Sequence, residues 1–282
     1  MNIFTTLLTQ PLANGLILFY RILGGNLGLA IIVFSLALRA ALSPLTKPYM
    51  DSMKNMKKYE KELNKLKQRH KGDKAKLMQA QSDFYKEKGI NPSAGCLPYL
   101  LQIVILIAFF RMFIGVLGND GDLAMKFNEL LYPPLQFAAD QHIATNFLYL
   151  DLKNPDVFNL PSLQFPLPGP LLILAAAVQF LSAKMSQPYI EEEKKLAKKT
   201  EGKSDDFAVA MQSSMIYTFP LITIVAGMRF PSGLAIYWAM FSIYQVYQQY
   251  NSGGWGGATP FIKRLRMIKL SNSNGERKDN KE

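Results

Sequence analysis

An arginine within an apolar run of membrane-spanning length is the feature that most constrains how this chain can fold. Residues 22–45 read ILGGNLGLAIIVFSLALRAALSPL, and Arg39 is the only charged residue among them. A charge deep in a bilayer costs about 2.5–3.5 kcal/mol on insertion scales, so it persists where it faces water, a partner or a substrate. With a membrane boundary near Lys47, Arg39 lies eight residues inside, or about 12 Å at the helical rise. The sequence therefore predicts a cation buried within one leaflet.

Four further apolar stretches are long enough, or nearly long enough, to cross a bilayer as helices. They cover residues 95–117, 170–185, 213–228 and 233–250. Together with the first run they predict an all-α, polytopic membrane protein with five transmembrane helices in a core of residues 21–250. The stretches 170–185 and 213–228 hold only 16 residues each. Because 16 residues reach about 24 Å against a hydrocarbon core near 30 Å, they also predict a locally thinned membrane.

The distribution of lysine and arginine predicts the orientation of these helices. Residues 46–94 hold 13 basic and 6 acidic side chains, whereas residues 118–168 hold 2 basic and 6 acidic ones. Residues 184–211 hold 6 of each, and the tail 251–282 holds 7 basic and 3 acidic ones. Basic connections lie on the cytoplasmic side of membrane proteins. We therefore expect the N-terminus outside, residues 46–94 and 184–211 inside, residues 118–168 (the outer segment) outside, and the C-terminus inside.

The segments around the core have their own patterns. Residues 1–20 lack a basic signal-peptide start, and Pro11 and Asn14 are expected to break them, which favours an interfacial helix on the outer surface. Residues 48–89 carry two weak apolar stripes separated by HKGDK, residues 70–74. They predict an antiparallel helical hairpin, with one long helix through Gly72 as the alternative. Residues 191–206 are expected to be a mobile loop and residues 251–282 a basic, partly disordered tail.

The residue inventory argues against several catalytic chemistries. No phosphate-binding G-x-x-x-x-G-K-[ST] loop is present, so direct ATP hydrolysis is unsupported. The two histidines, His70 and His142, fall on opposite sides of the predicted membrane, and the single cysteine, Cys96, excludes a disulfide within the chain. The apolar stretches hold no carboxylates for a proton relay. The sequence predicts a protein that is not an enzyme and has no metal or cofactor.

Polar side chains inside the predicted spans suggest a binding site. Arg39, Gln102 and Gln179 lie at similar depths in the inner leaflet on three different helices, and Ser35 lies on the same helical face as Arg39. This arrangement predicts a hydrated cavity open to the cytoplasm and closed outward. Simpler interpretations stay open: Arg39 could snorkel to the headgroups, the glutamines could form interhelical hydrogen bonds, and Trp238 could belong to an outer aromatic belt.

Several motifs occur in the order and spacing of one family. Arg39 before SPLTKP, the basic hairpin, NPSAGCLPYLLQ, FLYLDL and FPSGLAIYW, over about residues 15–250, resemble the YidC/Oxa1/Alb3 membrane protein insertases. The resemblance implies an insertase and chaperone that needs no ATPase of its own. It implies a substrate groove with its arginine at Arg39 and polar positions at Gln179, Trp238 and, by motif context, Gln102. It further implies a compact bacterial form, although an organellar origin stays open.

These patterns lead to one favoured function and two alternatives. We expect the protein to insert nascent membrane proteins with short translocated segments into a bacterial cell membrane, with Arg39 attracting acidic client tails. The basic hairpin and tail are expected to meet the ribosome, its RNA or anionic lipids, and a Sec translocon is a further candidate partner. The alternatives are a small-anion transporter with Arg39 as counter-ion and a scaffold for membrane complexes. Against the transporter, the chain shows no inverted repeats.

Overall fold

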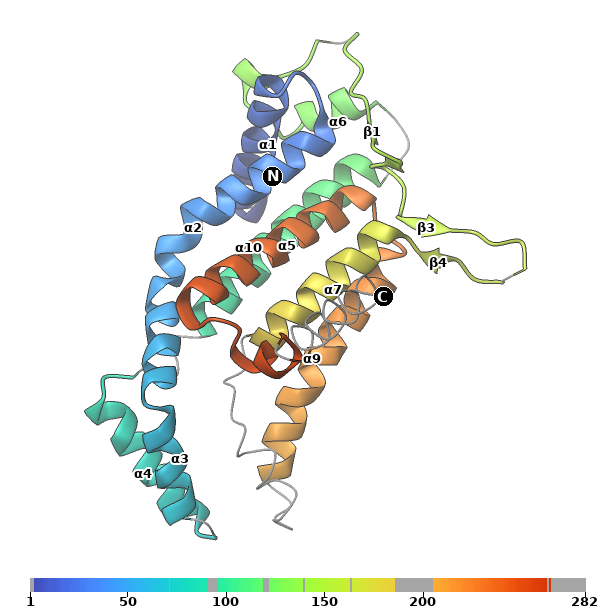
Figure 1. The fold of residues 1–282 in the computed structure, drawn as a ribbon. Coiled ribbons are helices and arrows are strands. Elements are labelled where there is room, and N and C mark those ends of the chain that lie inside the picture. The colour runs from blue at the N-terminus through green and yellow to red at the C-terminus, as the bar shows by residue number, and fades with distance from the viewer. Residues whose placement is uncertain are drawn as a thin grey trace, which may run out of the picture.

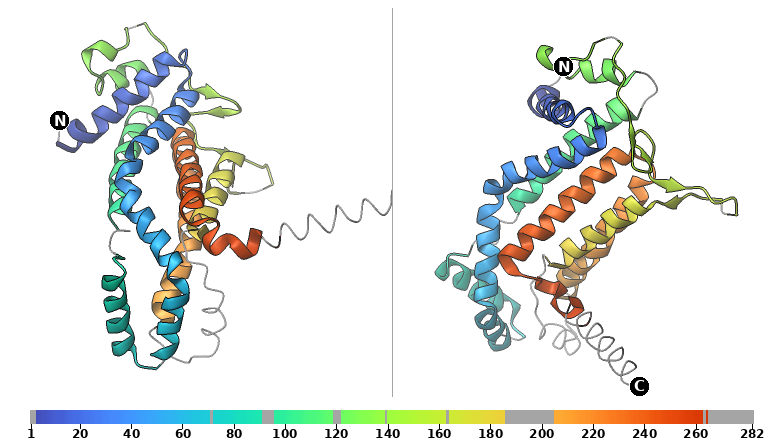
Figure 2. Two further views of the ribbon diagram at one scale, coloured as in Figure 1. Left: turned by 60° about the vertical axis from the view of Figure 1, so that its left-hand side comes forward. Right: turned by 45° about the horizontal axis from the view of Figure 1, so that its top comes forward.

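The computed structural model describes residues 3–70, 72–90, 96–118, 122–138, 140–162, 164–185, 205–262 and 264. Most of these residues are helical, which confirms the all-α class. The five long helices are α2 (Leu27–Lys58), α5 (Cys96–Leu117), α7 (Pro170–Met185), α9 (Asp205–Gly227) and α10 (Ser232–Gly253). α10 lies between α2 and α7 and packs mainly against these two, while α9 packs on the other side of α7 (Figures 1 and 2).

The predicted spans and the observed helices differ at their ends. Among the described helices, one segment, Leu27–Pro48, is both long and apolar enough to cross a membrane. Shorter apolar segments are Ile103–Leu117, Pro170–Met185 and Ile216–Gly227. α7 has the predicted bounds, whereas α9 holds 23 residues and begins at Asp205, before the predicted start at residue 213. The apolar part of α9, Ile216–Gly227, is short, as predicted. Five membrane-spanning helices stay a prediction.

α2 begins later and ends later than the apolar run that predicted it. The run starts at Ile22, but Gly24 and Gly25 turn the chain with φ of 71° and 79° before α2 starts at Leu27. The helix then continues through Pro44 and Pro48 to Lys58, well beyond the basic boundary at which the predicted span ends. Figure 1 shows that α2 changes direction along its length. The two prolines supply the cause, since each removes a backbone hydrogen bond of the helix.

The N-terminal helix is continuous, contrary to the predicted break. A short π-helix, η1 (Thr5–Thr9), leads directly into α1 (Gln10–Ile22). Asn14 lies inside α1, where its Nδ2 donates to the carbonyl of Leu130 at 3.0 Å. Its Oδ1 accepts from the backbone N–H of Tyr132 at 2.7 Å. These tertiary bonds satisfy an amide that would otherwise compete with the helix backbone.

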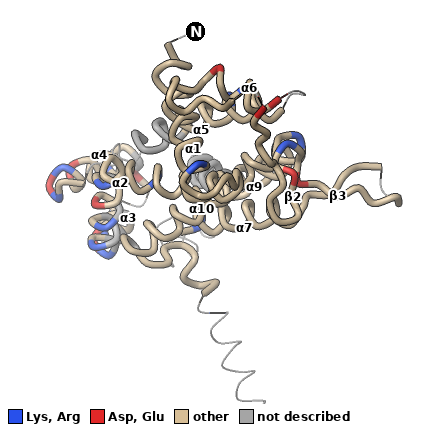
Figure 3. The backbone as a smooth tube through the Cα atoms, turned by 90° about the horizontal axis from the view of Figure 1, so that it is seen from above, with Lys and Arg blue, Asp and Glu red and all other residues tan. Residues whose placement is uncertain are grey.

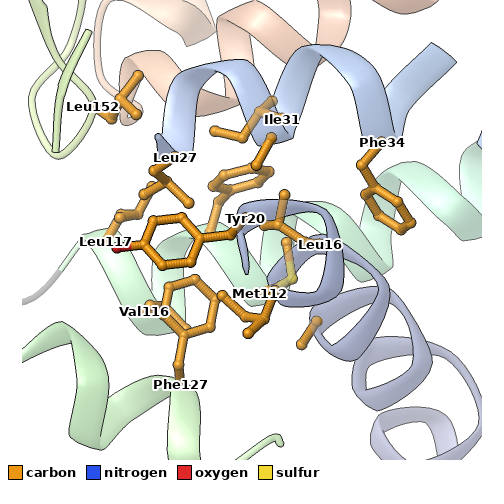
Figure 4. Packing of buried hydrophobic residues seen from close by; sticks show 14 of the residues in the cluster. Leu16, Tyr20, Leu27, Ile31, Phe34, Met112, Val116, Leu117, Phe127 and Leu152 are labelled. Carbon is orange, nitrogen blue, oxygen red and sulfur yellow. The ribbon is translucent and has the colours of Figure 1, made fainter. Parts of the chain in front are cut away.

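α1 also belongs to the main hydrophobic core, which its prediction as a surface helix did not anticipate. Leu16 and Tyr20 of α1 are buried, and Figure 4 shows them beside Met112 and Val116 of α5. Outside the core, the guanidinium of Arg21 donates to the carbonyls of Leu135 and Gln136, both at 2.9 Å. The N-terminal helix is therefore held by apolar packing on one face and by polar contacts with the outer segment on another.

The hairpin prediction is confirmed, and the single long helix is excluded. α3 (Glu60–Arg69) and α4 (Lys74–Glu87) are separated by a turn in which Gly72 has a φ of 102°. Asp73 caps α4 by accepting the N–H of Lys76 at 3.1 Å. The two helices share a small core of their own around Leu63, Phe84 and Ile90. The hairpin lies at the far end of α2, and Lys and Arg gather on it (Figure 3).

The outer segment contains a short helix, together with four strands that the sequence analysis missed. The helix is α6 (Leu123–Asn128), followed by a 3-10 turn, η3 (Pro133–Leu135). β1 (Asn146–Phe147) pairs antiparallel with β2 (Leu150–Asp151), and β3 (Val157–Phe158) with β4 (Leu167–Pro168). Each strand has two residues, too few to show the alternation by which strands are recognised. Another 3-10 turn, η4 (Gly256–Ala258), follows α10. Residues 191–204 and most of the tail lie outside the described residues.

The outer segment caps the first turns of α7 and α10. The carboxylate of Asp156 accepts the N–H of Leu172 at 2.9 Å. At α10, the N–H of Ser232 donates to the carbonyl of Asn154 at 2.8 Å, and its hydroxyl donates to the carbonyl of Asp151 at 3.0 Å. Helix starts leave backbone N–H groups without intrahelical partners, which is costly away from water. The outer segment supplies the missing acceptors for both helices.

Candidate functional site

Arg39 points toward the bundle from α2. Its guanidinium carbon lies 4.3 Å from the centroid of the Phe241 ring on α10, within the range of a cation–π contact. The side chain is half-buried, and its Nε atom is shielded from solvent. An aromatic ring attracts the cation without neutralising its charge. The side chain that the sequence analysis singled out therefore lies where α2 and α10 meet.

Ser35 and Trp238 accompany Arg39 on these two helices. Ser35 is buried one turn before Arg39, and its hydroxyl donates to the carbonyl of Ile31 in the same helix. Trp238 is half-buried against the main core and lies three residues before Phe241, on the same face of α10. Ser35 and Arg39 thus lie on α2 and Trp238 on α10, two helices that pack together, and a common site for the three residues stays a prediction.

Gln179 belongs to a different helix interface. Its Oε1 accepts the hydroxyl of Thr223, at 2.6 Å, between α7 and α9. Three residues further along α7, Ser182 donates to Oε1 of Gln249 on α10, at 3.4 Å. Both contacts match the simpler interpretation of polar residues in the spans, an interhelical hydrogen bond. Gln102 lies in α5, but its side chain falls outside the described residues. A single cavity lined by Arg39, Gln102 and Gln179 stays a prediction.

Sequence reasoning did not find the partners of these side chains. Phe241 is one of 18 phenylalanines, so its type carried no signal. Thr223 is buried in an apolar helix, and a hydroxyl there can bond to its own backbone as well as to a neighbour. Pairing Thr223 with Gln179 required knowing that α7 and α9 are neighbours. Among the described residues, no group of three or more His, Cys, Asp or Glu could hold a metal ion.

The hydrogen bond between α7 and α9 yields a prediction. Replacing Thr223 with valine keeps the side-chain shape but removes the donor, so Gln179 loses its partner. We expect the free energy of unfolding in detergent to fall by about 0.6–1.7 kcal/mol. Thr218→Val is the matched control, because Thr218 is exposed on the same helix and bonds to its own backbone carbonyl at Ser214. Equal stability of the two variants would show that the bond contributes nothing.

Known proteins resemble this chain over most of its length. The family model described as "60Kd inner membrane protein" matches residues 18–252. The membrane protein insertase YidC of Fusobacterium nucleatum is 35% identical over 226 residues, which are 80% of this chain and 85% of that protein. YidC 2 of Bacillus anthracis is 27% identical over 253 residues, 88% of this chain and 80% of that protein.

A longer relative matches in part of its own length. YidC of Pelobacter propionicus is 30% identical over 248 residues, which are 86% of this chain but 38% of that protein. The alignment leaves most of that relative without a counterpart here. The family model nevertheless covers the five long helices almost completely, together with the hairpin and the outer segment. The chain therefore belongs to the 60Kd inner membrane protein family, in agreement with its resemblance to the YidC/Oxa1/Alb3 insertases.

Proposed function

We propose that this protein is a membrane protein insertase of the bacterial cell membrane. It moves short translocated segments of newly made membrane proteins into the bilayer and is not an enzyme. The names of its bacterial relatives support the general role. The observation that carries the mechanism is Arg39, a cation within the apolar segment Leu27–Pro48, held at the contact of two helices.

The proposal includes five membrane-spanning helices: α2, α5, α7, α9 and α10. Their outward faces support it, since large apolar side chains are exposed where lipid would cover them. Examples are Ile107 on α5, Ile173 on α7 and Val225 on α9. α10 is less apolar, but most of its first half is buried against other helices, so it needs little lipid-compatible surface. The charge pattern supports an external N-terminus and an internal C-terminus.

In the proposed mechanism, a client segment moves along the contact of α2 with α10 in the inner leaflet. Its acidic tail is held transiently by Arg39, while Phe241 keeps the guanidinium in place. Attraction between the charges strengthens as water is excluded, although a hydrated cavity lined by Arg39, Gln102 and Gln179 would moderate it. The basic hairpin α3–α4 and the tail would contact the ribosome or anionic lipids, with a Sec translocon as a further partner.

Depleting the protein from cells tests this function against its alternatives. We expect newly made membrane proteins with short translocated segments to accumulate uninserted, while uptake of small anions is unchanged. Loss of anion uptake with normal insertion would instead indicate the transporter. Normal insertion and uptake, with membrane complexes failing to assemble, would indicate a scaffold. Restoring the wild-type chain is the control for each defect.

Cysteine labelling tests the hydrated cavity itself. In a Cys96→Ser background, single cysteines at Arg39, Gln102 and Gln179 should react with a small hydrophilic thiol reagent added from the cytoplasmic side. Val225→Cys is the control, because this exposed residue of α9 should face lipid and react poorly. Inertness at all three cavity positions would indicate a dry, packed interior and contradict the proposed cavity. Labelling only from the outer side would reverse the proposed orientation.

A further inference from the structure

The hairpin formed by β3 and β4 extends away from the helices. It forms the last part of the outer segment, starts beside α7 and projects beyond the bundle (Figures 1 and 2). Three of its large apolar side chains are exposed: Phe158 by 49%, Leu160 by 45% and Phe165 by 60%. The main hydrophobic cluster of the described residues does not include them. The fold thus presents apolar side chains on a projection that does not need them for its core.

The hairpin carries no charge, and neither does the helix that follows it until Lys184 in its last turn. Residues 157–183 contain no Asp, Glu, Lys or Arg, whereas charged residues make up 19% of the whole chain. The nearest acidic residue, Asp156, is 4% exposed and accepts the N–H of Leu172, so it adds no charge to the surface. A loop extending into water is normally polar or charged. Aromatic and aliphatic side chains without charges are typical of a segment at a membrane interface.

The apolar surface continues from the hairpin into α7. Gly169 joins β4 to the helix, whose first turns expose Ile173 and Leu174. If α7 spans the bilayer as proposed above, its first turn lies at the outer lipid interface, and the hairpin begins at the same level. We propose that the β3–β4 hairpin inserts Phe158, Leu160 and Phe165 into the outer phospholipid interface beside α7. Because the hairpin is uncharged, this contact is indifferent to the charge of the headgroups.

Fluorescence of the full-length protein in phosphatidylcholine vesicles tests the proposal. An environment-sensitive fluorophore is attached to Leu160→Cys or Phe165→Cys in a Cys96→Ser background. Ala144→Cys, exposed elsewhere in the outer segment, is the aqueous control, and Val225→Cys on α9 is the lipid control. At a depth of about 5–10 Å, quenching by iodide at positions 160 and 165 should be roughly threefold weaker than at position 144. Lipids with a shallow nitroxide should quench these two labels more strongly than lipids with a deep one.

The outcomes of this experiment distinguish insertion of the hairpin from its alternatives. Iodide protection with shallow lipid quenching, unchanged when a third of the lipid is phosphatidylglycerol, supports the insertion. Iodide quenching equal to that at position 144 overturns it, as does protection without lipid quenching, which would indicate a protein contact instead. Lipid quenching that requires phosphatidylglycerol would overturn the charge-independent contact. If the label at position 225 is quenched by the lipid nitroxide while those at 160 and 165 are not, the hairpin proposal fails and the membrane-spanning arrangement stands. If none of the three labels is quenched by the lipid nitroxide, both the hairpin proposal and the membrane-spanning arrangement are contradicted.

Discussion

Replacing Arg39 with alanine is expected to lower insertion of clients with acidic translocated tails about tenfold and to change neutral-tailed clients little. Two opposite charges 4 Å apart attract by about 1 kcal/mol in water and about 4 kcal/mol at an effective dielectric of 20. In a partly hydrated cavity, the attraction should lie toward the lower value, and about 1.4 kcal/mol corresponds to the tenfold effect. The measurement is the inserted fraction of matched clients that differ only in tail charge.

Arg39→Lys distinguishes the possible roles of this cation. A mobile acidic tail needs a positive charge and no fixed geometry, so lysine should retain most of the activity. The Phe241 contact predicts a modest loss, since arginine stacks on a ring better than lysine does. If lysine failed as badly as alanine, a fixed bidentate partner would be indicated. Full activity of Arg39→Ala on every client would refute the electrostatic mechanism and favour a snorkelling side chain.

Replacing Asp156 with alanine is expected to lower the free energy of unfolding by about 1–3 kcal/mol, because a buried N–H of α7 loses its acceptor. The carboxylate also lies at the start of a helix, where a negative charge is favourable. Its other partner is the Tyr149 hydroxyl, which donates to both carboxylate oxygens at 3.3 Å. Burial raises the pKa of the Tyr149 phenol and keeps this donor protonated. Thermal unfolding in detergent at neutral pH is the measurement.

Matched variants distinguish the loss of the helix cap at Asp156 from the loss of any carboxylate. Asp140→Ala removes an exposed acid from the same outer segment and should leave the unfolding temperature unchanged. Asp156→Asn keeps the shape and one acceptor and should lie between wild type and alanine. Gly169→Ala should also destabilise, because an added Cβ would overlap the carboxylate of Asp156. A melting curve of Asp156→Ala that overlays that of Asp140→Ala would contradict the capping role.

Much of the fold was predictable because its signals are local. Gly169 precedes α7, Pro170 begins it and Lys184 lies in its last turn, so its bounds agree with the sequence prediction. The break between α3 and α4 was marked by HKGDK in the same way. One wrong prediction concerns a local signal that distant contacts override. Asn14 does not break α1, because Leu130 and Tyr132, more than a hundred residues away, bind its side chain.

In the candidate site, too, local signals could be found from the sequence and contacts between distant residues could not. Arg39 could be found from sequence because a charge in an apolar run is costly wherever the helix packs. Its ring partner Phe241, and the pairing of Gln179 with Thr223, depend on which helices are neighbours. A common depth in the membrane suggested that Arg39 and Gln179 share one cavity. Depth does not specify direction around a helix axis, and the two residues contact different neighbouring helices.

The continuity of α2 has a mechanical consequence. At 1.5 Å per residue, the 32 residues of α2 follow a path of about 48 Å that carries Arg39 in its first half and leads to the α3–α4 hairpin. Pro44 and Pro48 lie between Arg39 and the hairpin, and each removes one backbone hydrogen bond from the helix. α2 is therefore easiest to bend between its first half, which packs into the main core, and the half that leads to the hairpin. If the hairpin binds a ribosome or a lipid surface as proposed, a force on the hairpin would bend α2 near these prolines and leave the contact of Arg39 with Phe241 intact.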